Sequence, residues 1–264
     1  MNPPILIENL DTSSLEPLAM LALDAGRMLM EAGASAKSTE RLVTQFATGL
    51  GAERVELRIG YASLAITIGK GANGITRMRK ISALGVNQRL DQALRGLAER
   101  VANRELTLTQ TRVELNRLAT DQPRHPAWVM ALAVGVACAA FGRLLAADWL
   151  AIGPIFGAAT LGQFLRRELL HRRVNPFFCA TLVAFFGATL GGWGAQWAGS
   201  GTVMTAMLAS ILLLVPGVPA VNAQTDILEG HPTLGSARAV TVVMTLVFMA
   251  AGLWFAQLLV HPVP

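Results

Sequence analysis

The chain has 264 residues, of which 53% are hydrophobic and 15% are charged, and its mean hydropathy is +0.47. An average soluble domain carries about 25% charged residues, so this composition argues against an ordinary soluble protein. The net charge of +5 is weak, and the arginines alternate with acids as on a solvated surface. No basic stripe is present, and we therefore expect no nucleic-acid partner.

Charge divides the chain into two domains. Only ten of the Lys, Arg, Asp and Glu residues lie after position 124. We predict an N-terminal cytosolic domain over residues 1–124 and a membrane domain over residues 125–264. The first 14 residues contain acids and no basic run, so no signal peptide is indicated and the N-terminus is expected in the cytosol.

Periodicity in the polar half predicts a small α+β domain. Ser35 is suited to cap the second helix, and Thr107 and Gln110 form a capping-box pattern before the fourth. The apolar phase shifts after the first strand, which predicts a bulge or short turn near residues 62–63. The expected order is ααββαα, with elements near residues 18–32, 35–50, 55–61, 75–81, 86–101 and 107–118.

A glycine-rich segment, residues 69–74, matches G-x-G-x-x-G. A dinucleotide-binding loop needs a helix directly after it, and a strand-like run follows here instead. We therefore interpret the segment as a hairpin turn, with Asn73 and Gly74 supplying the positive φ. No catalytic constellation is apparent. The four histidines show no metal-ligand spacing, and Cys138 and Cys179 lie in apolar runs as small buried hydrophobes, so neither a metal nor another cofactor is expected.

The membrane half contains five apolar segments that we expect to cross the bilayer. A crossing helix needs about twenty apolar residues. The basic segment 166–173 and the connection 226–238 both fall on the cytosolic side if the N-terminus does, which satisfies the positive-inside rule and places the C-terminus in the periplasm. The glycines of the second and third segments are expected to pack helices closely. The expected spans are residues 127–147, 150–165, 176–198, 202–225 and 239–260.

The fourth segment carries the strongest functional signal. Pro216, Gly217 and Pro219 interrupt it, and proline removes a main-chain donor and clashes with the preceding turn. A simple structural kink is the alternative to a broken helix. Lipid cannot satisfy freed carbonyls, so a broken helix faces protein or a water-filled path, as in transporter binding sites. Pro219 suits the first position of a new half-helix, whose positive end could face a substrate carboxylate.

Polar residues follow the break at once. Asn222, Thr225 and Asp226 lie on the new half-helix, and Asn222 and Asp226 share a face because they are four residues apart. Asp226 could accept a substrate ammonium or a coupling proton, or it could be an interfacial acid exposed to the cytosol.

Arg143 and Asp148 are the other candidate substrate-binding residues. Arg143 is expected near the outer interface as a gate or an anion contact, with Asp148 as its candidate partner. The lesser candidates are Gln163, Thr181, Thr189 and Thr241.

Three motifs carry a family resemblance over residues 18–260. They are G-A-S-x-x-x-T-E-R-L at residues 33–42, F-x-R-L…D-W at residues 141–149, and V-P-G-V-P-x-V-N-A…D-I-L-x-G at residues 215–230. The chain resembles the threonine/serine exporter (ThrE) family. Full-length members have about ten spans, and this chain is similar to the larger, YjjP-like subunit of the split two-component form.

The resemblance implies a subunit of a secondary exporter of small carboxylate metabolites in the bacterial inner membrane. The split form is associated with succinate and the fused form with threonine and serine. It implies a small second membrane subunit as partner. Assembly of several copies of this chain is left open by the sequence. No enzyme activity is expected. The alternative is a non-transporting membrane sensor or scaffold whose cytosolic domain binds a partner.

Overall fold

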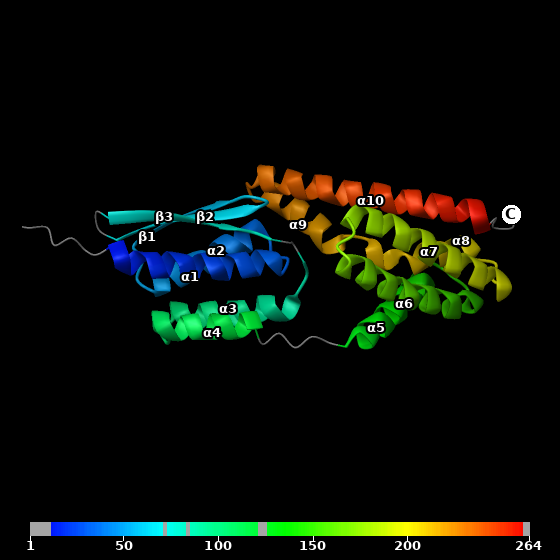
Figure 1. Ribbon diagram of the computed structural model, residues 1–264, viewed down its shortest axis with the longest axis horizontal. Helices are drawn as coiled ribbons and strands as arrows, with labels where there is room; N and C mark the ends of the chain where they lie inside the picture. The colour runs from blue at the N-terminus through cyan, green and yellow to red at the C-terminus, as the bar shows by residue number, and fades with distance from the viewer. Residues whose placement is uncertain (1–11, 71–72, 83–84, 121–125, 261–264) are drawn as a thin grey trace, which may run out of the picture. The chain divides into compact units, whose positions relative to one another are not determined.

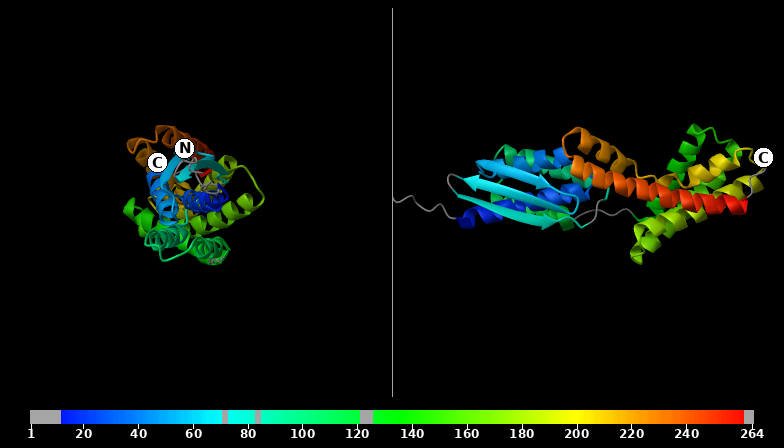
Figure 2. Two further views of the ribbon diagram at one scale, coloured as in Figure 1. Left: turned by 90° about the vertical axis from the view of Figure 1, so that its left-hand side faces the viewer. Right: turned by 90° about the horizontal axis from the view of Figure 1, so that it is seen from above.

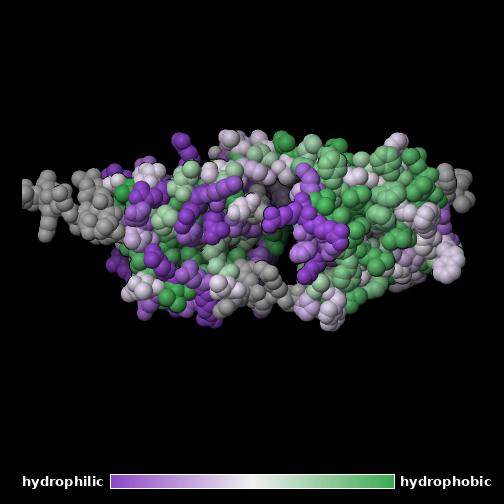
Figure 3. Space-filling model, viewed as in Figure 1, coloured by the Kyte–Doolittle hydropathy of each residue, from purple (hydrophilic) through white to green (hydrophobic). Residues whose placement is uncertain are grey.

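The computed structural model describes residues 12–70, 73–82, 85–120 and 126–260. The chain forms two compact units. The first unit comprises Met1–Gln122 and Val218–Ala239, and the second comprises Pro123–Gly217 and Val240–Pro264. Residues 218–239, which the sequence analysis assigned to the membrane domain, therefore group with the polar half. Hydrophilic residues gather over the first unit and hydrophobic residues over the second (Figure 3).

The first unit is layered, with helices α1 (Thr12–Glu31) and α2 (Ala36–Gly49) between a sheet and a second helix pair (Figure 1). The second pair is α3 (Gln88–Ala102) and α4 (Leu108–Thr120). The buried positions of α2 recur every three or four residues, so one face of the helix enters the core. Phe46 of α2 is fully buried there.

The sheet has three antiparallel strands in the order β1 (Arg54–Ile59), β2 (Ser63–Lys70) and β3 (Asn73–Lys80). Figure 2 shows the three strands side by side. Leu64, Ile66 and Ile68 of β2 are fully buried beneath α1, because alternate side chains of a strand share one face.

Two strands were predicted, and the sheet has three, so the predicted number of strands was wrong. The phase shift after residue 61 marks a tight hairpin, in which Gly60 N donates to Ser63 O at 2.9 Å and a new strand begins. The order is therefore ααβββαα. The hairpin interpretation of the glycine-rich segment fits the register, in which Lys70 lies opposite Asn73, although residues 71–72 lie outside the described residues. Gly74 was predicted to supply a positive φ in the turn, but it pairs with Gly69 as part of β3 and has no positive φ, so that part of the prediction was wrong.

Helix ends follow the predicted capping. Ser35 accepts from Ser38 N as the N-cap of α2. At α4, Gln110 N donates to Thr107 Oγ1 at 3.4 Å while Thr107 N donates to Gln110 Oε1 at 2.9 Å, which confirms the capping box.

The second unit contains the apolar helices. Its members are α5 (Ala127–Leu144), α6 (Trp149–His171), α7 (Pro176–Trp197), α8 (Val203–Ser210), the 3-10 turn η1 (Leu212–Leu214) and the latter part of α10 (Pro232–Val260). The remaining helix, α9 (Gly217–Leu228), lies almost wholly in the first unit. Buried alanines dominate one of the two small cores of the second unit, so the helices around it approach closely, whereas larger residues such as Met207 and Ile211 fill most of the other.

Three helices are long and apolar enough to cross a membrane, namely α5, α7 and α10, and a fourth crossing results if the bent pair α8–η1 and α9 is one span. The α6 helix is not among them in the part of the chain that the structure describes, because Arg166, Arg167 and Glu168 lie within its last turns. The count is thus three or four candidate spans.

The glycines of the second unit divide into two groups. A Cβ at Gly187 or Gly192 of α7 would meet Ile211 or Met207 at 3.3 and 2.8 Å, which confirms the packing role predicted for them. A Cβ at Gly153 or Gly157 of α6 would meet nothing within 4 Å, so these glycines do not pack inside the described chain.

Candidate functional site

The helical ladder breaks where the sequence predicted it. After α8, Leu214 N donates to Ile211 O in a 3-10 turn, and Pro216, which has no N–H, separates this turn from α9. The new helix begins at Gly217, so Pro219 lies in its first turn and not at its first position. A first-turn proline costs little, because those N–H groups have no helical partner.

Asp226 of α9 is the centre of a buried cluster. Its side chain is 0% exposed. Its Oδ1 accepts from Ala36 N at 2.8 Å, and its Oδ2 accepts from Arg238 Nη1 at 2.6 Å. Arg238, at the start of α10, is 3% exposed. The alternative of an exposed interfacial acid is therefore wrong for Asp226.

The same cluster holds the α1–α2 loop by its main chain. Arg238 Nη2 donates to Ala34 O at 3.0 Å, and Asn222 Nδ2 donates to Gly33 O at 2.7 Å. Asn222 and Asp226 thus act from one face of α9, as their spacing predicted. We call the set formed by Asn222, Asp226, Arg238 and the loop residues 33–36 the loop clamp.

Local chemistry explains why a carboxylate sits at this loop. Gly33 ends α1 with a φ of +99°, a left-handed conformation that favours glycine. A Cβ there would also approach Gly85 O to 2.6 Å. Ala36 N is the first amide of α2, and the N-terminus of a helix attracts negative charge. Asp226 supplies that charge, and Arg238 balances it.

A tight helical hairpin presents the clamp residues. Gly230 ends α9 with a φ of +90°, and His231 N donates to Asp226 O at 2.7 Å. On α10, a Cβ at Gly235 would lie 2.7 Å from Ala223 O. The two helices therefore pack main chain against main chain. Leu234 of α10 is 2% exposed and completes the apolar core of the first unit.

One ion pair and one contact between a histidine and an acid border the clamp. Lys37 Nζ lies 3.3 Å from Glu229 Oε1, and His231 Nε2 lies 3.6 Å from Glu40 Oε2. Both pairs join α2 to the α9–α10 turn. The motif at residues 33–42 and the motif at residues 215–230 therefore meet in space through charged and main-chain contacts.

Arg143 and Asp148 form a separate cluster in the second unit. Arg143 donates to Ala147 O, and its guanidinium lies 4.4 Å from the centroid of the Trp149 ring. Asp148 accepts from Ser200 Oγ and Gly201 N, each at 2.9 Å. The predicted partnership of the two residues was wrong, since no ion pair joins them among the described residues.

Asp148 is also the N-cap of α6, where it accepts from Ala151 N at 2.9 Å. Partial desolvation alone would raise the pKa of this carboxyl. The hydrogen bonds from Ser200, Ala151 and Gly201 outweigh that effect and hold the pKa of Asp148 below its ordinary value.

The lesser candidates differ in how they are satisfied. Thr181 Oγ1 of α7 donates to Phe248 O of α10 at 2.9 Å. Gln163 Oε1 and Thr189 Oγ1 are buried without a hydrogen-bond partner in the described chain. An unsatisfied buried oxygen inside an apolar unit is costly, and a passing water or solute could bind it. Thr225 is half-buried one residue before Asp226.

Comparisons with known proteins decide the family. The family model described as "Putative threonine/serine exporter" matches residues 20–260. The chain belongs to the threonine/serine exporter family. It is 31% identical to "Probable succinate transporter subunit YjjP" of Klebsiella aerogenes over 92% of this chain and 96% of that protein. The protein of the same name from Escherichia coli is 31% identical, over 93% and 98%. An uncharacterised protein of Haemophilus influenzae is 22% identical over 77% of this chain and 79% of its own length.

No solved structure matches the chain. The family and the apolar helices together make this chain a membrane protein of exporter type and a YjjP-like member of the family. The motifs that carried the resemblance are thus motifs of the exporter family, and two of the three form the loop clamp.

Sequence reasoning missed several residues of both clusters. Arg238 appeared only as a charge flanking a span, and its carboxylate partner lies twelve residues earlier on the preceding helix. Gly33 and Ala34 take part through main-chain oxygens, which no side-chain pattern reveals. Ser200 was foreseeable, because it lies in the Gly-Ser-Gly segment between the spans predicted at residues 176–198 and 202–225.

Proposed function

We propose that this chain is one subunit of a secondary transporter that exports small carboxylate metabolites across the bacterial inner membrane. The solute class comprises a dicarboxylate such as succinate and the amino acids threonine and serine. A small second membrane subunit completes the transporter. The family membership and the break at Pro216 support this proposal most directly.

The break is suited to a solute because it interrupts an apolar helix. Val203–Leu214 alone measures only about 18 Å at 1.5 Å per residue, which is short of the roughly 30 Å hydrocarbon core. The crossing therefore needs the first turns of α9, and the break falls within it. At the break Val215 N donates to Leu212 O and Gly217 N donates to Val215 O, and Pro219 has no N–H. The main-chain N–H groups of Val218 and Ala220, in the first turn of α9, are therefore the donors proposed to meet a solute. A carboxylate is a natural ligand for such N–H groups.

The loop clamp suggests how α9 is held in place. Pro216, Gly217 and Pro219 line the break and are proposed to contact the solute. Asn222 and Asp226 fix the other end of α9 to the α1–α2 loop. Their direct contact with the solute, and that of Thr225, Arg143 and Asp148, stays a prediction, because Asp226 is fully buried by protein donors.

The proposed topology has five crossings, with the N-terminus in the cytosol and the C-terminus in the periplasm. The short apolar part of α6 is the fifth crossing, and the arginines of its last turns reach the cytosolic interface. An odd number of crossings leaves room for a second unit of opposite orientation, an arrangement common among secondary transporters.

Counterflow in proteoliposomes tests this function. The purified chain, with and without the small second subunit, is given labelled succinate or threonine against an excess of unlabelled solute. We expect uptake of label for at least one solute when both subunits are present. The absence of counterflow for both solutes, with both subunits inserted, would favour a sensor or scaffold instead.

A further inference from the structure

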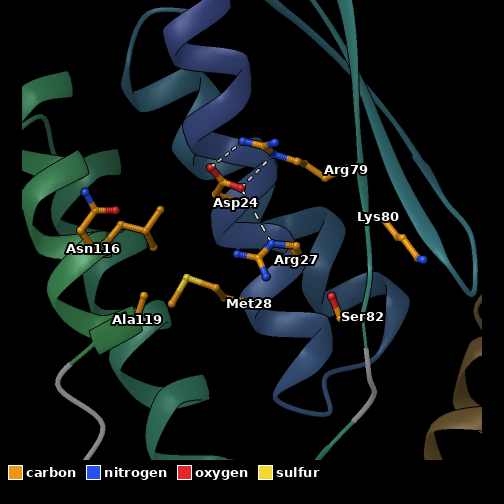
Figure 4. A pocket seen from close by; sticks show the side chains of 9 residues that line it. Asp24, Arg27, Met28, Arg79, Lys80, Ser82, Asn116 and Ala119 are labelled. Carbon is orange, nitrogen blue, oxygen red and sulfur yellow. Dashed lines mark hydrogen bonds and ion pairs between the residues drawn. The ribbon is translucent and has the colours of Figure 1, made fainter.

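A concave site in the first unit lies apart from the helix break and the loop clamp. It has a cavity volume of about 470 Å³, which falls within the range of roughly 300–1,000 Å³ for small-molecule sites. Its walls come from α1, from the end of β3 and from α4 (Figure 4). The lining residues are Asp24, Arg27, Met28, Arg79, Lys80, Ser82, Leu115, Asn116 and Ala119.

One wall of this pocket is cationic. Arg27 and Arg79 both reach toward Asp24 from different elements (Figure 4). Arg79 Nε and Nη2 donate to the two oxygens of Asp24 at 3.0 and 3.4 Å. Arg27 Nε lies 3.8 Å from the same carboxylate. Two guanidinium groups therefore share one acid.

Arg27 and Arg79 each have a guanidinium N–H group that no described residue accepts. Arg27 Nη1 donates to Glu31 Oε2 at 3.0 Å, and the other oxygen of Glu31 accepts from Ser82 N at 3.0 Å. Arg79 Nη1 and Arg27 Nη2 have no hydrogen-bond partner in the described part of the chain. Lys80 carries a positive charge that no described acid balances. Three cations facing two acids leave the pocket with a surplus positive charge.

The opposite wall comes from α4 and is of mixed character. Leu115 is 3% exposed and packs into the domain core. Asn116 and Ala119 lie on either side of it at the rim of the pocket. The apolar side chain of Leu115, the amide of Asn116 and the unpaired guanidinium N–H groups together suit a short carbon chain that ends in a carboxylate.

We propose that this pocket binds the carboxylate group of a small organic acid. The ligand class is taken from the proposed function, so the chain would bind in its polar unit the same kind of solute that it exports. The bound carboxylate accepts from Arg79 Nη1 and Arg27 Nη2, and Lys80 adds attraction at the rim. Asp24 contacts both arginines and competes with the ligand for them.

Ligand binding in the pocket can affect the loop clamp through α1. Arg27 precedes Gly33 by six residues, about 9 Å along a helix. Glu31 lies between them and connects Arg27 to Ser82. A ligand that draws Arg27 away from Glu31 loosens the last turn of α1, on which the loop of the clamp depends. Solute binding in the polar unit would then change how firmly the loop clamp holds α9.

Isothermal titration of the full chain in detergent at low ionic strength tests the site, with succinate, L-threonine and phosphate as ligands. We expect succinate to bind. Arg79→Gln should weaken that binding by about tenfold or more, because it removes a charge-assisted hydrogen bond. Asp24→Asn should strengthen it, because it removes the competing carboxylate.

Arg77→Gln is the matched control. Arg77 lies two residues from Arg79 on the same face of β3, donates to Glu16 Oε1 at 2.9 Å and is 38% exposed, compared with 40% for Arg79. It does not line the pocket, so its loss should leave succinate binding unchanged. Circular dichroism establishes that each variant is folded.

Equal losses of binding in Arg77→Gln and Arg79→Gln would overturn the site, as would weaker binding in folded Asp24→Asn. Phosphate binding tighter than succinate would overturn the carboxylate assignment. The Pro216→Ala/Pro219→Ala variant should keep the binding heat of the pocket. Normal counterflow with no binding in the pocket would overturn this inference alone, whereas binding without counterflow would overturn the exporter function and leave the site.

Discussion

Two aspartates that looked alike in the sequence have opposite surroundings in the structure. Asp226 is fully buried, is paired with Arg238 and bonds the first amide of α2. Asp148 caps α6 at the edge of the second unit and bonds two residues of the turn before α8, with no ion pair among the described residues. Both fix one segment of main chain to another, and direct contact of either one with a solute stays a prediction. They differ in how much folding stability the protein would lose if each were replaced.

The difference shows why charge near a membrane span is an ambiguous sign of a solute site. A carboxylate bonded by neutral donors at a half-exposed helix end costs little to place there. A buried ion pair is costly to form and still more costly to break, since the remaining charge is left without a partner. The predictions below measure this contrast, from the largest effect to the smallest.

Breaking the buried pair should have the largest effect on stability. Arg238→Met leaves Asp226 buried beside one amide, and we expect a loss of about 3–5 kcal/mol in the stability of the first unit. Thermal unfolding followed by circular dichroism measures it, and hydrogen exchange over residues 33–42 reports the loop directly. The double variant Asp226→Leu/Arg238→Met should recover part of the loss. A single variant as stable as wild type would show that the pair is not formed in solution.

Adding a side chain where α9 and α10 touch should destabilise the first unit somewhat less. Gly235→Ala places a Cβ 2.7 Å from Ala223 O and 2.5 Å from Ile227 Cγ1, and such overpacking costs about 1–3 kcal/mol. Gly153→Ala is the control, because its Cβ would meet nothing within 4 Å. Unfolding of the two variants in parallel gives the comparison. Equal stability of the two would contradict the close packing of the hairpin.

Removing one neutral hydrogen bond of the loop clamp should have a smaller effect. Asn222→Ala leaves Gly33 O without its donor, at a cost of about 1–2 kcal/mol. Faster hydrogen exchange near Gly33 should accompany it. Exchange that rises only in the second unit would argue against a contact between the two motifs.

The smallest effect belongs to Asp148, and it depends on pH. Because the folded state lowers the pKa of Asp148, its contribution to stability is present above the ordinary pKa of an aspartate and is lost as the pH falls through the lowered value. We expect Asp148→Asn to be less stable than wild type at pH 7, with the difference vanishing in acid. Unfolding of both proteins over a range of pH, followed by circular dichroism, measures it. A constant difference at every pH would contradict the assigned hydrogen bonds.

Much of the fold followed from local pattern. Helical spacing and caps predicted α1 to α4, and paired prolines predicted the break before α9. The phase shift predicted a bulge or a short turn near residues 62–63, and the hairpin after Gly60 confirms the turn. The strand that follows it was not counted separately, so one of the three strands was missed. Five spans were predicted. Three helices, or four with the bent pair, have the length and hydropathy of a crossing helix in the described chain, and the crossing by α6 stays a prediction.

The loop clamp could not be predicted in the same way. Asp226 and Ala36 are 190 residues apart, and the groups that meet are largely main-chain atoms. No periodicity or spacing encodes such a contact in one sequence. Two of the three motifs that carry the family resemblance, residues 33–42 and residues 215–230, nevertheless meet at this contact.

The account depends most on the break as the place where a solute meets the chain. The direct test is labelled-succinate counterflow with Pro216→Ala/Pro219→Ala, compared with wild type and with Gly153→Ala, each inserted with the second subunit and each folded by circular dichroism. The account predicts that Gly153→Ala transports as wild type does, while the proline variant loses most of its flux. Wild-type flux from the proline variant would contradict it.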